Sequence, residues 1–210
     1  MDFDTADWIT PWPNPKSDLR AVGDDSMVAY PTWRRSPEDP WFGYVEGYRL
    51  AAQAIVDQAR TCGLNHDSLI FPFLMCWRHY VELRLKSLIN LVQRGTGVEI
   101  NVPSTHNLAK LWEKAACMVD EVGAFDDDKS TQHVRRLILQ LHALDPTAQE
   151  ARYPITTKGL PTFDKVDRLD MRTIHEAMDG VANYLTGTDV GLTEHFRFRQ
   201  ELAEEYRYDW

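Results

Sequence analysis

A long apolar segment with four ionisable side chains in its middle constrains this chain more than any other feature. The segment FPFLMCWRHYVELRLKSLI, residues 71–89, is apolar around most of a helical circumference, which is typical of a helix buried in a bundle. Arg78, Glu82 and Lys86 recur every fourth residue and form one stripe along the segment, with His79 beside them. Because an unpaired buried charge is costly, the fold must supply partners for this stripe.

Two interpretations of the stripe are open. Glu82 lies one helical turn from both Arg78 and Lys86, so the three form a ladder of surface ion pairs if the helix is peripheral. If the helix is buried, the stripe becomes the floor of a polar pocket between helices, and other segments must contribute to it.

The rest of the chain predicts an all-α bundle of five or six helices. The only strand signal is VEINV, residues 98–102, which is short. Apolar residues at three- and four-residue spacing, bounded by capping residues and helix breakers, predict helices over residues 41–63, 68–93, 105–119, 129–144, 165–185 and 193–206. The helical bundle is expected over residues 41–190, followed by a C-terminal docking helix over 191–210.

Residues 1–40 predict an extended N-terminal arm. Repeated prolines forbid a regular helix, while the tryptophans are atypical of a solvated tail (Trp8, Trp12, Trp33, and Trp41 at its end). We expect this arm to lie on the helical body or to bind a protein partner.

Composition limits the classes of function. The net charge of −9 argues against a surface that coats nucleic acid broadly, although one basic cleft is compatible with it. The three cysteines form no CxxC motif or disulfide framework, and neither zinc-ligand spacing nor a phosphate-binding glycine loop is present. The acidic, proline-interrupted start is unlike a signal peptide, and no apolar run reaches the ~20 residues of a membrane span. We expect a cytoplasmic protein with no membrane segment, cofactor or metal.

Three motifs in order carry a resemblance to a known family: WRHYVELRLKSLI, then THNLAKLW at residues 105–112, then LDP and ARYP at residues 144–154. Over about residues 41–185, this pattern resembles bacterial helical proteins related to the HEPN superfamily. The chain departs from the pattern at Thr105, where glycine is expected, and at Asn107, where aspartate is commoner.

The resemblance implies a HEPN-like helical bundle that forms a homodimer. It also implies a role in phage defence or a toxin–antitoxin system. Two activities are consistent with it: a metal-independent ribonuclease that binds RNA, or a non-catalytic module for protein interaction and dimerisation with an internal ion-pair network.

The ribonuclease activity that the resemblance implies requires an arginine followed at short spacing by a histidine. In that family the arginine stabilises the phosphate and the histidine assists proton transfer from the 2′-hydroxyl. Two pairs, Arg168/His175 and Arg135/His142, have a spacing of seven that places both side chains on one helix face. Arg136/His142 and Arg60/His66 also fit the signature and rank lower. A solvated helix face is the alternative for each pair.

The matched motifs define a second candidate site that would bind an anionic ligand. His106 stands at an expected helix start, where the helix dipole favours the neutral ring, so it could act as a base. Pro154 restrains the preceding loop, and an Arg152–Glu82 ion pair forms if this loop crosses the stripe. The same contacts could be purely architectural. The full set is Arg78, His79, Glu82, Lys86, His106, Arg152 and Tyr153.

Overall fold

The computed structural model describes residues 18–20, 28–31, 41–63, 65–99, 101–123 and 129–208. The chain divides into two units, Met1–Glu38 and Asp39–Trp210. The predicted N-terminal arm lies almost wholly outside the described residues. The second unit holds all of the helices described below.

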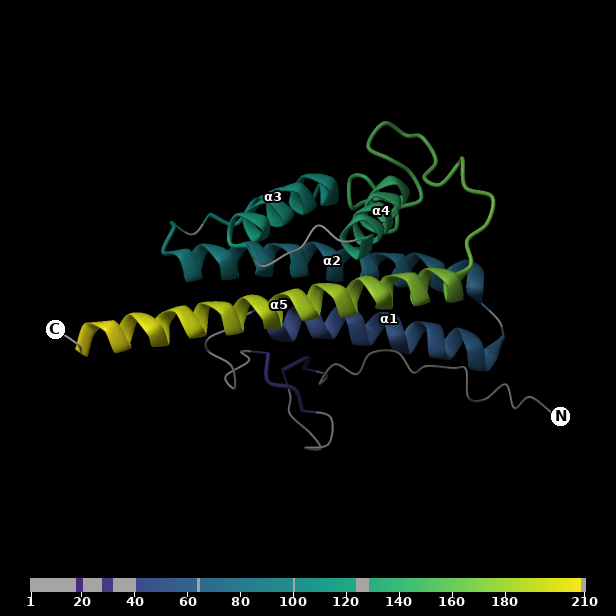
Figure 1. The fold of residues 1–210 in the computed structure, drawn as a ribbon. Helices are drawn as coiled ribbons and strands as arrows, with labels where there is room; N and C mark the ends of the chain where they lie inside the picture. Colours follow the sequence, from purple (N-terminus) through teal and green to yellow (C-terminus); the bar gives the residue numbers. More distant parts are fainter. Residues whose placement is uncertain are drawn as a thin grey trace. The chain divides into compact units, whose positions relative to one another are not determined.

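The described residues form an all-α bundle, as predicted. Its five helices, drawn in Figure 1, are α1 (Phe42–Cys62), α2 (His66–Thr96), α3 (Leu108–Glu121), α4 (Lys129–Leu144) and α5 (Met171–Tyr208). Helix α2 is the centre of the bundle, because it packs against each of the other four helices. Helices α1 and α5 run beside it, whereas α3 and α4 cover another of its sides (Figure 1).

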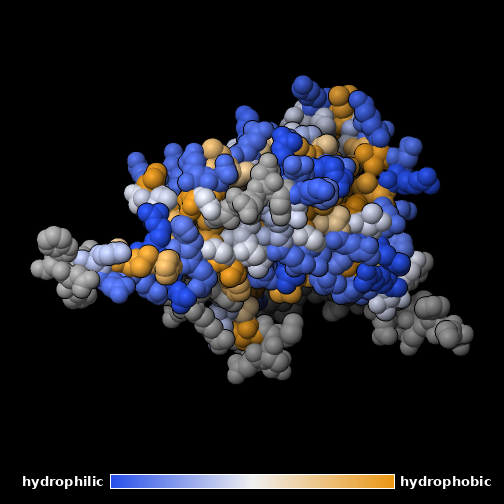
Figure 2. Space-filling view, in the orientation of Figure 1, coloured by the Kyte–Doolittle hydropathy of each residue, from blue (hydrophilic) through white to orange (hydrophobic). Residues whose placement is uncertain are grey.

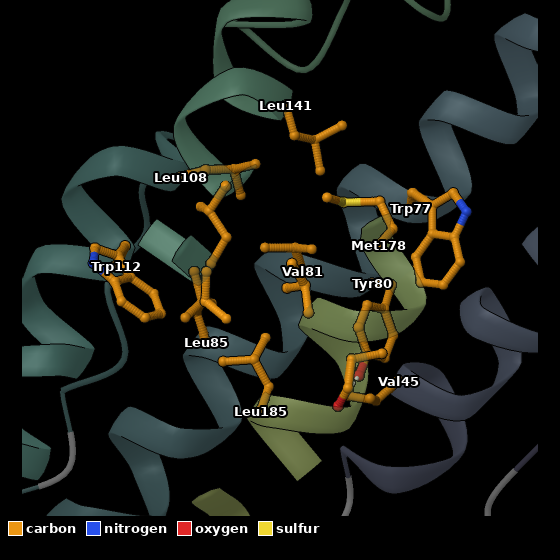
Figure 3. Close-up of a cluster of buried hydrophobic side chains, with 14 of the residues drawn as sticks. Val45, Trp77, Tyr80, Val81, Leu85, Leu108, Trp112, Leu141, Met178 and Leu185 are labelled. Carbon is orange, nitrogen blue, oxygen red and sulfur yellow. Dashed lines mark hydrogen bonds between the residues drawn. The ribbon is translucent and has the colours of Figure 1, made fainter. Parts of the chain in front are cut away.

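The core follows the amphipathic pattern of each helix. Large side chains from all five helices meet around α2, as Figure 3 shows for Val45, Tyr80, Leu108, Leu141 and Met178. All five side chains are buried, so their apolar area is removed from water, the main favourable term in folding. The face seen in Figure 2 is mostly hydrophilic, with separate apolar islands.

Helix ends follow local chemistry. Gly63 and Gly97 adopt left-handed conformations (φ 59° and 72°) and end α1 and α2, a geometry that glycine adopts without steric cost. The N-cap of α3 is Asn107, whose side chain accepts a hydrogen bond from the Lys110 amide at 3.0 Å. The prediction that α3 starts at residue 105 was therefore wrong by about one turn.

Helix α5 differs most from the sequence-based prediction. It begins at Met171 rather than 165, because the Asp170 side chain accepts from the Thr173 amide at 3.0 Å and caps the helix there. It then continues without a break through Gly187 and Gly191. The predicted sixth helix is therefore the second half of α5.

Long-range packing explains why α5 continues. Leu192 is fully buried, and the Phe196 ring lies directly over Gly95 of α2, where an added Cβ would approach ring atoms to 2.4 Å. Arg84 also joins α2 to α5, donating to Thr186 Oγ1 at 3.0 Å and to Asp189 Oδ2 at 3.4 Å. These contacts stabilise a helix that contains three unfavourable glycines, Gly180, Gly187 and Gly191.

The predicted strand at residues 98–102 is absent from its described residues, and the nearby Asn101 amide donates to the Gln93 side chain at 3.1 Å. A short run without a partner strand has no ladder to join. Across the ranges described, none of the helices has the length and apolar character needed to cross a membrane.

Candidate functional site

Glu82 is the centre of the polar stripe. Its Oε1 atom accepts from Lys86 Nζ at 2.9 Å and from His106 Nδ1 at 2.8 Å. Its Oε2 atom accepts from Arg78 Nη1 at 3.0 Å. One carboxylate thus links two side chains of its own helix to the segment that precedes α3.

Arg78 is enclosed by three parts of the chain. Besides Glu82, its guanidinium donates to the His106 carbonyl at 2.6 Å and to the Asp145 carbonyl at 2.9 Å. Its Nε atom also lies 3.5 Å from Asp145 Oδ2. Arg78 is 2% exposed and Glu82 is 1% exposed, so the solvent-side interpretation of the stripe is wrong. We call Arg78, Glu82, Lys86, His106 and Asp145 the polar cluster.

The protonation of Glu82 follows from these contacts. Burial acts to raise the pKa of Glu82, but the hydrogen bonds from Lys86 and His106 outweigh it, and the pKa lies below its ordinary value. Glu82 is therefore a carboxylate near neutral pH, and the bond with His106 is donated by Nδ1.

Asp145 brings a second carboxyl to the polar cluster. Burial, followed by the hydrogen bond with Glu150, raises the pKa of Asp145 to about 6. Burial also acts to raise the pKa of Glu150, but hydrogen bonds, first from Asp145, lower it to about 2. The pair therefore shares one proton over a wide pH range.

His106 and Lys86 form the solvent side of the polar cluster. The side chain of His106 is 60% exposed, and that of Lys86 is 11% exposed. Because Glu82 fixes the His106 ring through Nδ1, the neutral ring carries its lone pair on Nε2. A histidine oriented by a carboxylate can act as a base, provided that a substrate can approach it.

The remaining predicted pocket residues make no hydrogen bond or ion pair with Glu82 among the described residues. Arg152 and Tyr153 are exposed, and among the described residues the predicted Arg152–Glu82 ion pair is absent. His79 is half-buried and meets the Tyr48 ring edge-on, with ring centroids 4.4 Å apart. Burial lowers the pKa of His79, the Glu82 charge opposes this effect, and the Arg152 charge adds to it.

The structure separates Arg168 from His175. Arg168 is exposed and precedes the Asp170 cap, so the expectation that both residues lie on one helix face was wrong. His175 is 7% exposed, and its ring centroid lies 5.5 Å from that of Trp77 and 6.4 Å from that of Phe73. This histidine has the surroundings of a core residue.

Arg135 and His142 both lie on α4, two turns apart, as predicted. Arg135 is exposed, whereas His142 is half-buried. Burial, with a contribution from the Arg78 charge, lowers the pKa of His142, so its ring is neutral near pH 7. The two lower-ranked pairs differ in structure: Arg136 also lies on α4, but Arg60 and His66 lie on separate helices.

Sequence analysis missed Asp145 and Glu150 as members of the site. Asp145 was used only as the end of α4, although the LDP motif that contains it was part of the family pattern. The LDP motif was the available signal, because a residue in that pattern can hold another part of the chain, as Asp145 holds Arg78, as well as end a helix.

The described residues contain no cluster of three or more histidine, cysteine, aspartate or glutamate side chains able to hold a metal ion. Comparison of the chain with family models, with curated proteins and with solved structures found no match.

Proposed function

We propose that this protein is a HEPN-like helical interaction module of a bacterial defence or toxin-type system, in which the polar cluster is an internal ion-pair network. The observation that carries this proposal is the burial of Arg78 and Glu82, which are 2% and 1% exposed. A phosphate could reach the Arg78 guanidinium only by displacing partners that already occupy it.

The charge balance supports the same conclusion. Arg78 and Lys86 share the Glu82 carboxylate, and Asp145 lies against Arg78. The cations therefore have carboxyl partners inside the protein, and the polar cluster offers little net attraction to an anion. Its role in the proposal is to fix α2, the start of α3 and the end of α4 relative to one another.

The proposed module acts through its surfaces. The HEPN resemblance supports a homodimer, and the tryptophan-rich composition of residues 1–40 supports a protein partner bound by the N-terminal arm.

A metal-independent ribonuclease is the second candidate, and the pair on α4 favours it. Arg135 is exposed and available to a phosphate, while His142 has a lowered pKa that keeps it neutral, as a general base requires. In this candidate, Arg135 stabilises the phosphate and His142 accepts the proton of the 2′-hydroxyl.

RNA cleavage by the purified protein in EDTA distinguishes the two candidates. The interaction module predicts no cleavage above a buffer control, and no difference among the wild type, His142→Ala, His106→Ala and His175→Ala. If the wild type cleaves RNA and one folded histidine variant does not, the interaction-module proposal is wrong, the ribonuclease candidate is supported, and that histidine is identified as the base. Light scattering on the same samples measures the mass, and the proposal expects a dimer.

A further inference from the structure

A second feature of the bundle lies away from the polar cluster. A cavity of about 300 Å³ opens among α2, α3, α4 and α5. Its inner wall is apolar and includes Leu88, Trp112, Val119 and Leu185, each at most 5% exposed. Figure 3 shows Trp112 of α3 beside Leu85 of α2, with Leu185 of α5 next to them.

The cavity is an open pocket and not an enclosed void, because the exposed residues Cys117 and Asp120 line it. A cavity of about 300 Å³ lies at the lower end of the range of small-molecule sites, which are concave and largely apolar. An apolar wall of this extent gains free energy when an apolar molecule replaces water against it.

The polar side chains that line the cavity are less buried than its apolar wall. Thr131 of α4 and Tyr184 of α5 are joined there through their hydroxyl groups, with the oxygens 2.7 Å apart. Thr188, one turn further along α5, also lines the cavity. A few positioned hydroxyl groups above an apolar wall can orient a ligand that carries one polar end.

One acidic side chain lies at the rim, in the last turn of α3. Asp120 lines the cavity and is exposed, and it forms no ion pair with any of the described residues. Asp120 lies in the last turn of α3, which has no basic residue, and the negative end of the helix dipole adds to its charge. A cation at this position would be attracted by both, so the polar end that fits the rim is positively charged.

We propose that this cavity is a binding site for a small apolar amine. The apolar body of the ligand fills the space against Trp112, Leu88 and Leu185. Its protonated amino group lies at the rim, next to the Asp120 carboxylate and within reach of the hydroxyl groups of Thr131 and Tyr184. The site is independent of the polar cluster and goes beyond the interaction module proposed above.

Three probes of one shape and different charge test this site: 2-phenylethylamine, 2-phenylethanol and 3-phenylpropionate. Calorimetric titration of the wild type should give dissociation constants at least about tenfold lower for the amine than for the alcohol, with the carboxylate weakest. The Trp112 indole resonance should shift on binding, which locates the probe. Equal affinity for the three probes, no binding at millimolar concentration, or an unperturbed Trp112 signal would each overturn the proposal.

Matched variants separate charge from shape. Asp120→Asn should raise the dissociation constant of the amine to that of the alcohol. Glu113→Gln removes an equal charge from the same helix, outside the cavity wall, and should leave the dissociation constants of both the amine and the alcohol unchanged. Ala116→Phe, which adds a ring at the cavity wall, should abolish binding of both probes. If that variant does not fold, Ala116→Leu is used in its place. Unchanged amine binding in Asp120→Asn, or in a folded variant at Ala116, contradicts the site.

Discussion

Helix α2 takes part in two interhelical regions of opposite character. In the polar cluster, Glu82 and Arg78 find partners just before α3 and just after α4, at His106 and Asp145, and leave almost no surface of their own to solvent. One and two turns further along, Leu85 and Leu88 line a cavity that the neighbouring helices do not fill. The region around the buried charges Arg78 and Glu82 is closed, whereas the region with the apolar wall is open.

This difference distinguishes a region that holds the fold together from a region that can bind a ligand. A buried ion pair is stabilising only when its hydrogen-bonding groups are satisfied, so a working network must exclude competing ligands. An apolar cavity wall has no hydrogen-bonding groups that need partners, so a ligand can replace the water against it. Charged residues in a helix are thus a poor guide to a ligand site when their partners lie inside the same chain.

Removing the central carboxylate should have the largest effect. Glu82→Ala leaves Arg78 as a buried cation with fewer partners, and we expect the free energy of unfolding to fall by about 3–5 kcal/mol. Glu194→Ala is the control, because Glu194 pairs with Arg197 in an exposed contact on α5 and should lose at most about 1 kcal/mol. Urea unfolding followed by circular dichroism measures both. Equal losses in the two variants would mean that the polar cluster is no more important than a surface pair.

The Asp145–Glu150 pair predicts a pH dependence. In the folded protein the pKa of Asp145 is about 6, above its unfolded value of 3.8, so this carboxyl contributes stability at low pH that is lost as pH rises through 6. The pKa of Glu150 is about 2, below its unfolded value of 4.5, so its contribution is lost as pH falls toward 2. The contribution of the pair is therefore greatest near pH 4.

Asp145→Asn tests this window, because asparagine keeps the side chain uncharged. Between pH 5 and pH 7, the free energy of unfolding of the wild type should fall by about 1–2 kcal/mol more than that of the variant. Urea midpoints at several pH values provide the measurement. Parallel curves for the two proteins across this range would show that Asp145 does not titrate there.

A smaller effect is expected where α5 meets α2. Gly95→Ala places a Cβ against the Phe196 ring, so the ring must move, and the loss of packing should outweigh the better helix propensity of alanine by about 1 kcal/mol. Gly47→Ala is the matched control, because it stands in open space on α1 and should stabilise by up to about 1 kcal/mol. Hydrogen exchange should become faster around residues 193–206 only in Gly95→Ala. Unchanged protection there would contradict the role of this contact in holding the second half of α5.

Local patterns predicted most of the helices. The bounds of α4 were predicted from its apolar spacing and the Asp145–Pro146 stop, and the buried face of α3 agrees with its periodicity, from Leu108 to Val119. Both are properties of neighbouring residues.

Contacts between distant residues could not be predicted in the same way. Arg78 and Asp145 are separated by 67 positions, and only the fold brings them together. The continuation of α5 likewise depends on Phe196 reaching Gly95, whereas the glycines at 187 and 191 indicate a stop when read locally. The interhelical interpretation of the stripe agrees with the burial of Arg78 and Glu82, but the closure of the stripe depends on partners that the sequence does not place.

A double-mutant cycle on Arg78→Met and Glu82→Leu tests the central claim, that these charges hold the fold and not a ligand. We expect each single replacement to lower the free energy of unfolding by about 3–5 kcal/mol, because it leaves a buried charge without its partner. The double replacement should lose less than the sum, with an interaction energy of at least about 2 kcal/mol. The claim would be contradicted if each single replacement lowered the free energy of unfolding by less than about 1 kcal/mol and the double replacement lowered it by the sum of the two. The polar cluster would then again be a candidate ligand site.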